Sequence, residues 1–151
     1  PGQPSDDNLS QVRLTGISVS NRDFIYSGDR ITLGIEGSVL EGHICDREAL
    51  FVRLRSADTG QMLFQTSSKV CHVELPASGR FLIEVDLEMN VQAGVYLVET
   101  LVRDPKQWKL LVEGPRTYVH VMESKKFRGI VQMNPEMRLR DDRQPLPLRD
   151  E

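Results

Sequence analysis

The segment from Arg80 to Arg103 limits the possible fold more than any other part of the chain, because it holds two strand patterns of opposite character joined by a short turn. Residues 80 to 87 alternate strictly, and one face carries Phe81, Ile83, Val85 and Leu87. Such alternation is typical of an antiparallel strand with one face in the core. Residues 95 to 102 are nearly continuously apolar, which indicates a central strand covered on both faces.

The turn between these strands carries a second signal, Ala93-Gly94-Val95-Tyr96. It resembles the tyrosine corner of immunoglobulin-like sandwiches, in which a tyrosine near the start of one strand bonds back to the preceding turn. We therefore expect the hydroxyl of Tyr96 to bond to backbone between Glu88 and Gly94. This orientation directs Tyr96, Val98, Thr100 and Val102 into the core and leaves Leu97, Glu99, Leu101 and Arg103 on the outer face.

Further alternating runs lie on both sides of this segment. The first begins near Val12 and is interrupted at Thr15-Gly16, a spacing that predicts a β-bulge. Two more cover residues 30–40 and 49–56, with Leu50, Val52 and Leu54 inward in the second. The turn Ala57-Asp58-Thr59-Gly60 predicts a hairpin that returns as a short strand over 61–67.

After Arg103 the patterns are weaker. Trp108 to Val112 is apolar, Gly114-Pro115 is expected to end that patch, and Thr117 to Met122 is the last clear strand. No stretch of ten residues shows a helical apolar stripe with caps. The sequence therefore predicts an all-β protein, an antiparallel immunoglobulin-like or jelly-roll β-sandwich of about 7–9 strands.

The length and charge of the chain limit its class. The 151 residues are 39% hydrophobic, enough for one domain with a core. The net charge is -3, and the 19 Lys and Arg form no basic run, which argues against a nucleic-acid partner. No apolar run reaches the roughly 20 residues of a membrane span. The start at Pro-Gly-Gln-Pro favours a fragment or a processed chain.

The ends of the chain have little to bury. Residues 1–10 are rich in Pro, Gly, Ser and Asp and are interpreted as a linker remnant. The β-sandwich is expected to cover 11–139. Residues 140–151 alternate charge, contain two prolines and are expected to be a disordered tail.

Catalytic and metal-binding motifs are scarce. The sequence has no Gly-rich phosphate loop, no Gly-x-Ser-x-Gly and no His-Glu-x-x-His. His43, Cys45, Cys71 and His72 could together hold zinc or form part of a small hydrolase site. Adjacent strand residues point to opposite faces, however, so two free thiols and two loop histidines are the better interpretation. We therefore expect no enzyme activity, no cofactor and no bound metal.

The order of the strand and turn signals resembles a known family. It is carried by FIYSGDRITL (24–33), ADTGQMLFQTS (57–67), the strand 79–87, AGVY (93–96), and YVHV (118–121) with FRGIV (127–131). This series is similar to the C-terminal carbohydrate-binding domain of the ATP-binding subunit of O-antigen polysaccharide ABC exporters, the Wzt type. The resemblance covers roughly Val12 to Leu139.

The resemblance implies a dimeric sandwich that recognises a cell-surface polysaccharide or its modified end, and couples this recognition to export. It further implies a nucleotide-binding domain and a transmembrane subunit as partners, and a place at the cytoplasmic face of the inner membrane. The chain departs from the whole subunit because it has no Walker motif. It would then be the isolated domain, without nucleic-acid binding or direct membrane insertion.

The residues themselves indicate a binding face. If the strands that contain Ala49, Val95 and Thr117 share one sheet, their outer residues mix aromatic, cationic and acidic side chains. Sugars are bound by such mixtures, because rings stack on pyranoses while Arg and Glu bond to hydroxyls. The predicted carbohydrate-binding residues are Phe51, Arg53, Arg55, Glu99, Tyr118, His120 and Trp108. Trp108 could be a stacking platform or a cap on the core.

Other functions remain open at this point. Leu97 and Leu101 could pack on a partner subunit, so a protein–protein interaction module that uses the same outer face is the main alternative. The segment from Lys125 to Leu139 has apolar residues but no evident partner, and we expect it to pair across a two-fold axis in a homodimer. A secreted adhesive domain is disfavoured by the free cysteines.

Overall fold

The chain forms eight β-strands. The computed structural model describes residues 11–40, 48–104, 106, 108–124 and 136–139. The strands are β1 (Val12–Val19), β2 (Ile25–Tyr26), β3 (Arg30–Val39), β4 (Ala49–Ser56), β5 (Met62–Ser67), β6 (Gly79–Glu88), β7 (Gly94–Asp104) and β8 (Lys109–Met122). Within the described ranges there is no helix, and so none that could cross a membrane. The expected linker at 1–10, the tail at 140–151 and most of the expected pairing segment at 125–139 lie outside the described residues.

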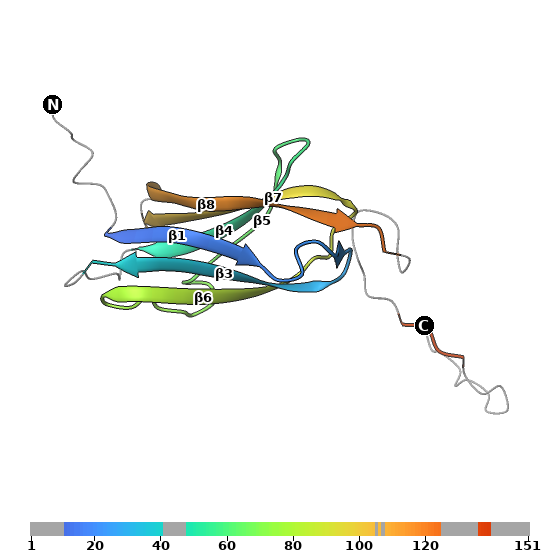
Figure 1. The fold of residues 1–151 in the computed structure, drawn as a ribbon, viewed down its shortest axis with the longest axis horizontal. Coiled ribbons are helices and arrows are strands. Elements are labelled where there is room, and N and C mark those ends of the chain that lie inside the picture. Colours follow the sequence, from blue (N-terminus) through green and yellow to red (C-terminus); the bar gives the residue numbers. More distant parts are fainter. Residues whose placement is uncertain (1–10, 41–47, 105, 107, 125–135, 140–151) are drawn as a thin grey trace, which may run out of the picture.

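The strands form two packed sheets, as Figure 1 shows. One sheet has the order β1-β3-β6, and the other has the order β2-β8-β7-β4-β5. All pairs are antiparallel except β2 with β8. The strands β1, β3 and β6 correspond to strands A, B and E of an immunoglobulin sandwich. The strands β4, β7 and β8 correspond to C, F and G, and β5 lies beside β4 in the place of C′. The predicted all-β sandwich is confirmed, with β7 as its central strand.

The core lies between the two sheets and follows the predicted alternation. The inner faces of β3 and β4 supply Ile31, Leu33, Ile35, Leu50, Val52 and Leu54, all buried. Tyr96 and Val98 of β7 join the same cluster, and Val102 belongs to a smaller cluster near Val12 and Val39. The inward and outward sets predicted for 49–56 and 95–102 are therefore confirmed, although Phe51 and Leu101 of the outward sets are buried on the outer side of the sheet.

The tyrosine corner is present. The Tyr96 hydroxyl donates a 2.6 Å hydrogen bond to the carbonyl oxygen of Gln92, in the turn before β7. Tyr96 is 5% exposed, and burial raises the pKa of its phenol. The bond fixes the entry of the chain into the central strand and lets a buried hydroxyl keep a partner.

The predicted β-bulge in the first strand and the predicted hairpin turn at Gly60 are both present. In the β1–β3 pair the register shifts between Leu14 and Gly16, so Thr15 is the extra residue of a bulge. In the β4–β5 hairpin the Gly60 amide donates to the Ser56 carbonyl oxygen over 2.8 Å, and Gly60 has a φ of 74°. Glycine adopts this left-handed conformation without steric cost.

The prediction that Gly114-Pro115 ends a strand is wrong, because β8 runs through both residues. The β7–β8 register shifts there, between Glu99 and Leu101, and the Thr100 hydroxyl donates to the Pro115 carbonyl oxygen over 2.6 Å. A Cβ at Gly114 would lie 2.4 Å from Thr100 Oγ1 and 2.5 Å from Leu14 Cδ1. The pair therefore forms a tightly packed bulge inside one long strand.

The two sheets differ in size, and one edge is less covered. A three-stranded sheet does not cover all of a five-stranded one, and β5 lies at the end of the larger sheet. Met62, Leu63 and Phe64 of β5 are 45, 43 and 43% exposed. The opposite end of this sheet is β2, which has only two residues.

Candidate binding face

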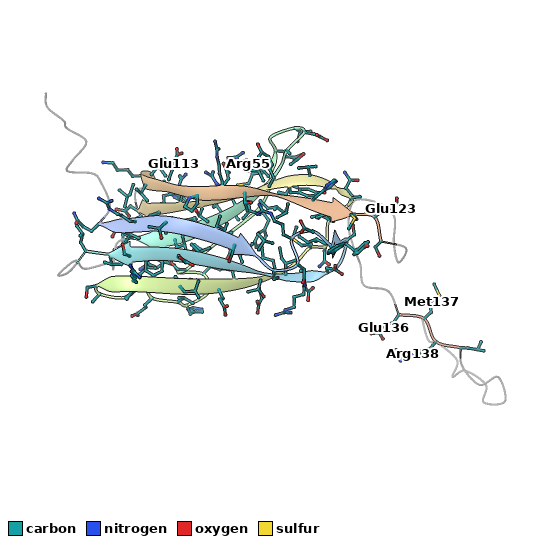
Figure 2. All side chains as sticks on the ribbon, in the orientation of Figure 1. Arg55, Glu113, Glu123, Glu136, Met137 and Arg138 are labelled. Atoms are coloured by element: carbon teal, nitrogen blue, oxygen red, sulfur yellow. The ribbon has the colours of Figure 1, made fainter. Side chains whose placement is uncertain are left out.

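The predicted site strands lie side by side in the five-stranded sheet, in the order β8-β7-β4. Arg53 lies opposite Glu99, and Glu99 lies opposite Arg116. Two residues further along, on the same face, Arg55 lies opposite Leu97, and Leu97 lies opposite Tyr118. In Figure 2, Arg55 projects from this sheet on the side away from β1, β3 and β6. The fold thus brings residues from three strands onto one outer surface, here called the outer face.

Glu99 is the centre of a charged cluster on the outer face. Its Oε1 accepts a 2.7 Å hydrogen bond from Arg55 Nε and lies 3.6 Å from Arg53 Nε. Its Oε2 lies 3.7 Å from Arg116 Nη1. The side chains of Glu99 and Arg53 are 16 and 19% exposed, whereas that of Arg116 is 65% exposed. One carboxylate thus pairs with three guanidinium groups, and only one of these contacts is a short hydrogen bond.

Burial and like charge act on Arg53. Desolvation by burial lowers the pKa of the Arg53 guanidinium, and the nearby charges of Arg55 and Arg103 lower it further, against the opposing effect of Glu99. Arg53 Nε and Arg103 Nε are both buried nitrogen donors without a hydrogen-bond partner. Donors of this kind are rare in folded proteins.

Trp108 covers one end of the outer face. Its ring centroid lies 6.1 Å from that of Phe51 at an interplanar angle of 52°, and 6.0 Å from Arg103 Cζ. Phe51 and Leu101 are only 5 and 2% exposed, and they pack together with Ala49. Trp108 itself remains 61% exposed. The Trp108 ring therefore packs on the buried Phe51 ring and still leaves much of its own surface accessible to solvent.

Tyr118 and His120 lie at the other end of the outer face, beside a hollow of about 330 Å³. Tyr118 is 60% exposed. Arg22, from the turn between β1 and β2, donates hydrogen bonds to Thr117 Oγ1 and to the Tyr118 carbonyl oxygen. The hollow is lined by Arg22, Asp23, Val95, Tyr118, Val119, His120 and Met122.

A second hollow, of about 380 Å³, lies between the β4–β5 hairpin and the turn before β7. It shares Val95 with the first hollow, so the two depressions adjoin. Its polar lining consists of Ser56, Asp58, Thr59, Gln61 and Gln92, with Tyr96 at one side. The hydroxyls and amides of this lining can both donate and accept hydrogen bonds, whereas the carboxylate of Asp58 only accepts them.

The alternative metal site is only partly described, because His43 and Cys45 lie outside the described residues. Cys71 is an exposed free cysteine whose Sγ lies 3.5 Å from Thr66 Oγ1. His72 follows it in the turn after β5, with a φ of 59°. Across the described ranges no three His, Cys, Asp or Glu side chains converge in a way that could hold a metal ion.

The structure adds residues that the sequence analysis did not assign to the site. Arg116 was missed because the strand was expected to begin at Thr117, although the alternation of Tyr118 and His120 extended back by two residues would have included it. Glu113 lies opposite Leu101 at the β8 bulge, and its negative charge acts to raise the pKa of Arg53. Arg22 reaches the face from a turn, and no periodic pattern predicts that contact.

The strand order and the tyrosine corner together define an immunoglobulin-like β-sandwich. Among solved structures, the chain is similar in fold to the C-terminal domain of Wzt, with a TM-score of 0.67 at 11% identity, covering 88% of this chain and 86% of that one. This likeness agrees with the family resemblance seen in the sequence.

Weaker structural matches include the alkylpurine DNA glycosylase AlkC of Pseudomonas fluorescens, with a TM-score of 0.49 and 15% identity over 75% of this chain and 31% of that one. A β-glucuronidase of Bacteroides uniformis has a TM-score of 0.47 and 17% identity over 74% of this chain and 14% of that one. Neither carries an argument about function. No family model and no curated protein matches the sequence.

Proposed function

We propose that this protein is a non-catalytic domain that recognises a cell-surface polysaccharide of O-antigen type on the outer face of β8, β7 and β4. The observation that carries the proposal is the row Arg116-Glu99-Arg53, which is flanked by two exposed aromatic rings, Tyr118 and Trp108. The rings lie toward opposite ends of the charged cluster.

This arrangement suits the chemistry of sugars. An exposed ring stacks on the apolar face of a pyranose, and guanidinium and carboxylate groups bond to adjacent hydroxyls. The two hollows that meet at Val95 offer further polar contacts. A polysaccharide that crosses the face could therefore contact several successive sugar units, each through a different group.

The place in a transporter is inferred from likeness. The fold similarity to the C-terminal domain of Wzt supports a role in O-antigen export. On this proposal, the domain acts beside a nucleotide-binding domain and a transmembrane subunit at the cytoplasmic side of the inner membrane. Glycan binding would then report to the transporter that a chain is ready for export.

Calorimetric titration with the O-polysaccharide of the source organism tests the glycan-binding proposal. Arg53→Ala and Arg55→Ala should each weaken binding by about 1.5 to 3 kcal/mol, the usual loss for a hydrogen bond to a charged group. Arg30→Ala is the matched control, because Arg30 pairs with Asp86 and Glu88 on the other sheet. Full binding by the Arg53, Arg55 double variant would place the glycan elsewhere, and no binding by the wild type would refute the proposal.

We further propose that the domain forms a homodimer. The alternative in which the outer face binds a protein instead of a glycan relied on exposure of Leu97 and Leu101, but Leu101 is 2% exposed. Leu97→Asp is therefore the informative variant, since Leu101→Asp would disturb the packing beneath Trp108. Dissociation of the dimer by Leu97→Asp in sedimentation would favour the protein-binding alternative. A wild-type monomer at micromolar concentration would refute the dimer.

A further inference from the structure

A cluster of charged side chains on the outer face has a net charge opposite to that of the chain as a whole. The complete chain has a net charge of -3. Arg53 interacts electrostatically with Arg55, Arg103, Glu99 and Glu113, and Arg116 pairs with Glu99. The cluster thus contains four arginines and two glutamates. The cluster therefore has more cations than anions, and the side chains of Arg53, Arg55 and Glu99 within it are mostly shielded from water.

The two glutamates do not satisfy the four guanidinium groups. Glu99 makes its short bond with Arg55, and its contacts with Arg53 and Arg116 are 3.6 and 3.7 Å, beyond ordinary hydrogen-bond length. Arg103 reaches the Trp108 carbonyl oxygen at 3.4 Å through Nη1, which leaves its buried Nε without an acceptor. Arg53 Nε is in the same position. Leaving a buried donor unpaired costs free energy, so an acceptor that met these guanidinium groups after a small side-chain movement would be stabilised.

A neutral hydroxyl could accept hydrogen bonds from these donors, but it would not neutralise the excess positive charge of the cluster. An oxyanion would do both, because a carboxylate or phosphate accepts two parallel hydrogen bonds from a guanidinium and also reduces the repulsion among the arginines. Trp108 lies directly beside Arg103 and remains largely exposed. A sugar ring stacked on Trp108 would hold its charged substituent next to Arg103 and Arg53.

We propose that the Arg53, Arg55, Arg103 and Arg116 cluster binds an oxyanion carried by the glycan, either the carboxylate of an acidic sugar or a phosphate ester on a neutral one. This inference rests on the proposed function and specifies its ligand. It predicts that polysaccharides with a charged group at the recognised position are preferred over matched neutral ones, and that added salt weakens their binding.

The test is a nuclear magnetic resonance titration of the full chain that follows the arginine Nε–H signals at constant ionic strength. Glucuronate and glucose 6-phosphate are the charged probes, and glucose is the neutral control. We expect at least one charged probe to shift the Arg53 and Arg103 signals while glucose does not, and the probe that acts identifies the source of the oxyanion. Equal shifts with glucose, or no shift with either charged probe, would overturn the inference.

Variants separate a specific site from a general charge effect. Arg116→Gln should weaken binding of the active probe by about tenfold without disturbing the fold, because Arg116 is 65% exposed. Arg30→Gln, equally exposed on the other sheet, should leave binding unchanged. Equal losses in both variants would overturn the inference, since they would indicate attraction by net charge alone.

The outcome is independent of the glycan titration described above. Binding of the O-polysaccharide through Arg53 and Arg55 without any response to the charged probes would retain the proposed function and overturn the oxyanion site. A response of Arg53 and Arg103 to glucuronate or glucose 6-phosphate without polysaccharide binding would support the oxyanion site and refute the proposed function.

Discussion

Glu99 lies directly opposite Arg53 in the β4–β7 pair, yet its short hydrogen bond is with Arg55, whose Nε is 2.7 Å from Glu99 Oε1. Arg55, the diagonal neighbour of Glu99, therefore bonds to the carboxylate oxygen that Arg53, the direct neighbour, would otherwise use. Diagonal pairs in a sheet are within reach of long side chains such as arginine. The consequence is an arginine that is mostly buried, charged and incompletely paired at the centre of the outer face.

The first prediction concerns Glu99→Gln. This change removes a carboxylate that contacts three arginines, so the folded state should lose about 1 to 3 kcal/mol in urea unfolding, between the values for exposed and buried ion pairs. Binding of a neutral glycan should weaken as well, because one strong acceptor is lost. Glu88→Gln on the other sheet is the control, since its pair with Arg30 is exposed. Unchanged stability would show that the three ion pairs contribute little.

The second prediction uses the single tryptophan of the chain as a probe of the outer face. Trp108 is 61% exposed, so acrylamide should quench its fluorescence readily. A saturating amount of the bound polysaccharide should reduce this quenching, and Trp108→Ala should weaken binding through lost stacking. Tyr118→Ala and His120→Ala should weaken binding in the same way. Quenching that is unaffected by bound polysaccharide would exclude Trp108 from the site.

The third prediction concerns the tyrosine corner. Tyr96→Phe removes the donor to the Gln92 carbonyl oxygen and leaves that acceptor without its partner, at a cost of about 1 to 2 kcal/mol of unfolding free energy. Chemical denaturation measures the loss. Tyr118→Phe is the matched control, because its side chain is largely exposed, and it should change stability by less than about 0.5 kcal/mol. Equal effects in the two variants would contradict a structural role for the Tyr96 hydroxyl.

The fourth prediction tests the bulge in β8. Gly114→Ala would place a Cβ 2.4 Å from Thr100 Oγ1 and 2.5 Å from Leu14 Cδ1, so we expect a loss of about 1 to 3 kcal/mol from overpacking. Gly16→Ala is the control, since the nearest atom to its added Cβ is 3.7 Å away. Thermal unfolding of both variants should separate them. A tolerated Gly114→Ala would mean that β8 moves freely relative to β1.

The fifth prediction concerns acid pH. The hydrogen bond from Thr32 Oγ1, with the nearby Arg30, holds the pKa of Asp86 below its ordinary value of 3.8. A carboxyl whose folded pKa is depressed stabilises the fold above its unfolded pKa, and this contribution is lost as pH falls through the folded pKa. Thr32→Val should therefore raise the Asp86 pKa toward 3.8 in a resonance titration. Thr15→Val on β1 should not, and an unchanged Asp86 pKa in Thr32→Val would assign the shift to Arg30.

Much of the fold could be predicted because strand alternation has a fixed period. Leu50, Val52 and Leu54 alternate with the larger residues Phe51, Arg53 and Arg55, so their inward orientation follows once residues 49–56 form a strand. The Tyr96 corner and the Thr15 bulge were also readable from local spacing. The continuity of β8 was not, because Gly114-Pro115 usually signals a break, and only the Thr100 bond and the close contact with Leu14 explain its place inside a strand.

The candidate site was less predictable, because its side chains depend on contacts distant in sequence. Alternation placed Phe51 and Leu101 on the outer face, but it could not show that Trp108 covers Phe51 or that Leu101 is buried. Arg53 and Arg55 look equivalent in the sequence, and their different contacts with Glu99 depend on rotamers. Arg22 approaches from a separate turn, 96 residues before the Tyr118 carbonyl that it contacts.

The uncovered β5 strand has a consequence for how the protein behaves at high concentration. Its six residues, Met62 to Ser67, carry no charge, whereas β6, at an edge of the other sheet, carries Arg80, Glu84, Asp86 and Glu88. Charged side chains on an edge oppose pairing with strands of other molecules, and an uncharged apolar edge lacks this protection. Intermolecular β-pairing and aggregation should therefore begin at β5, and a lysine introduced into this strand should improve solubility.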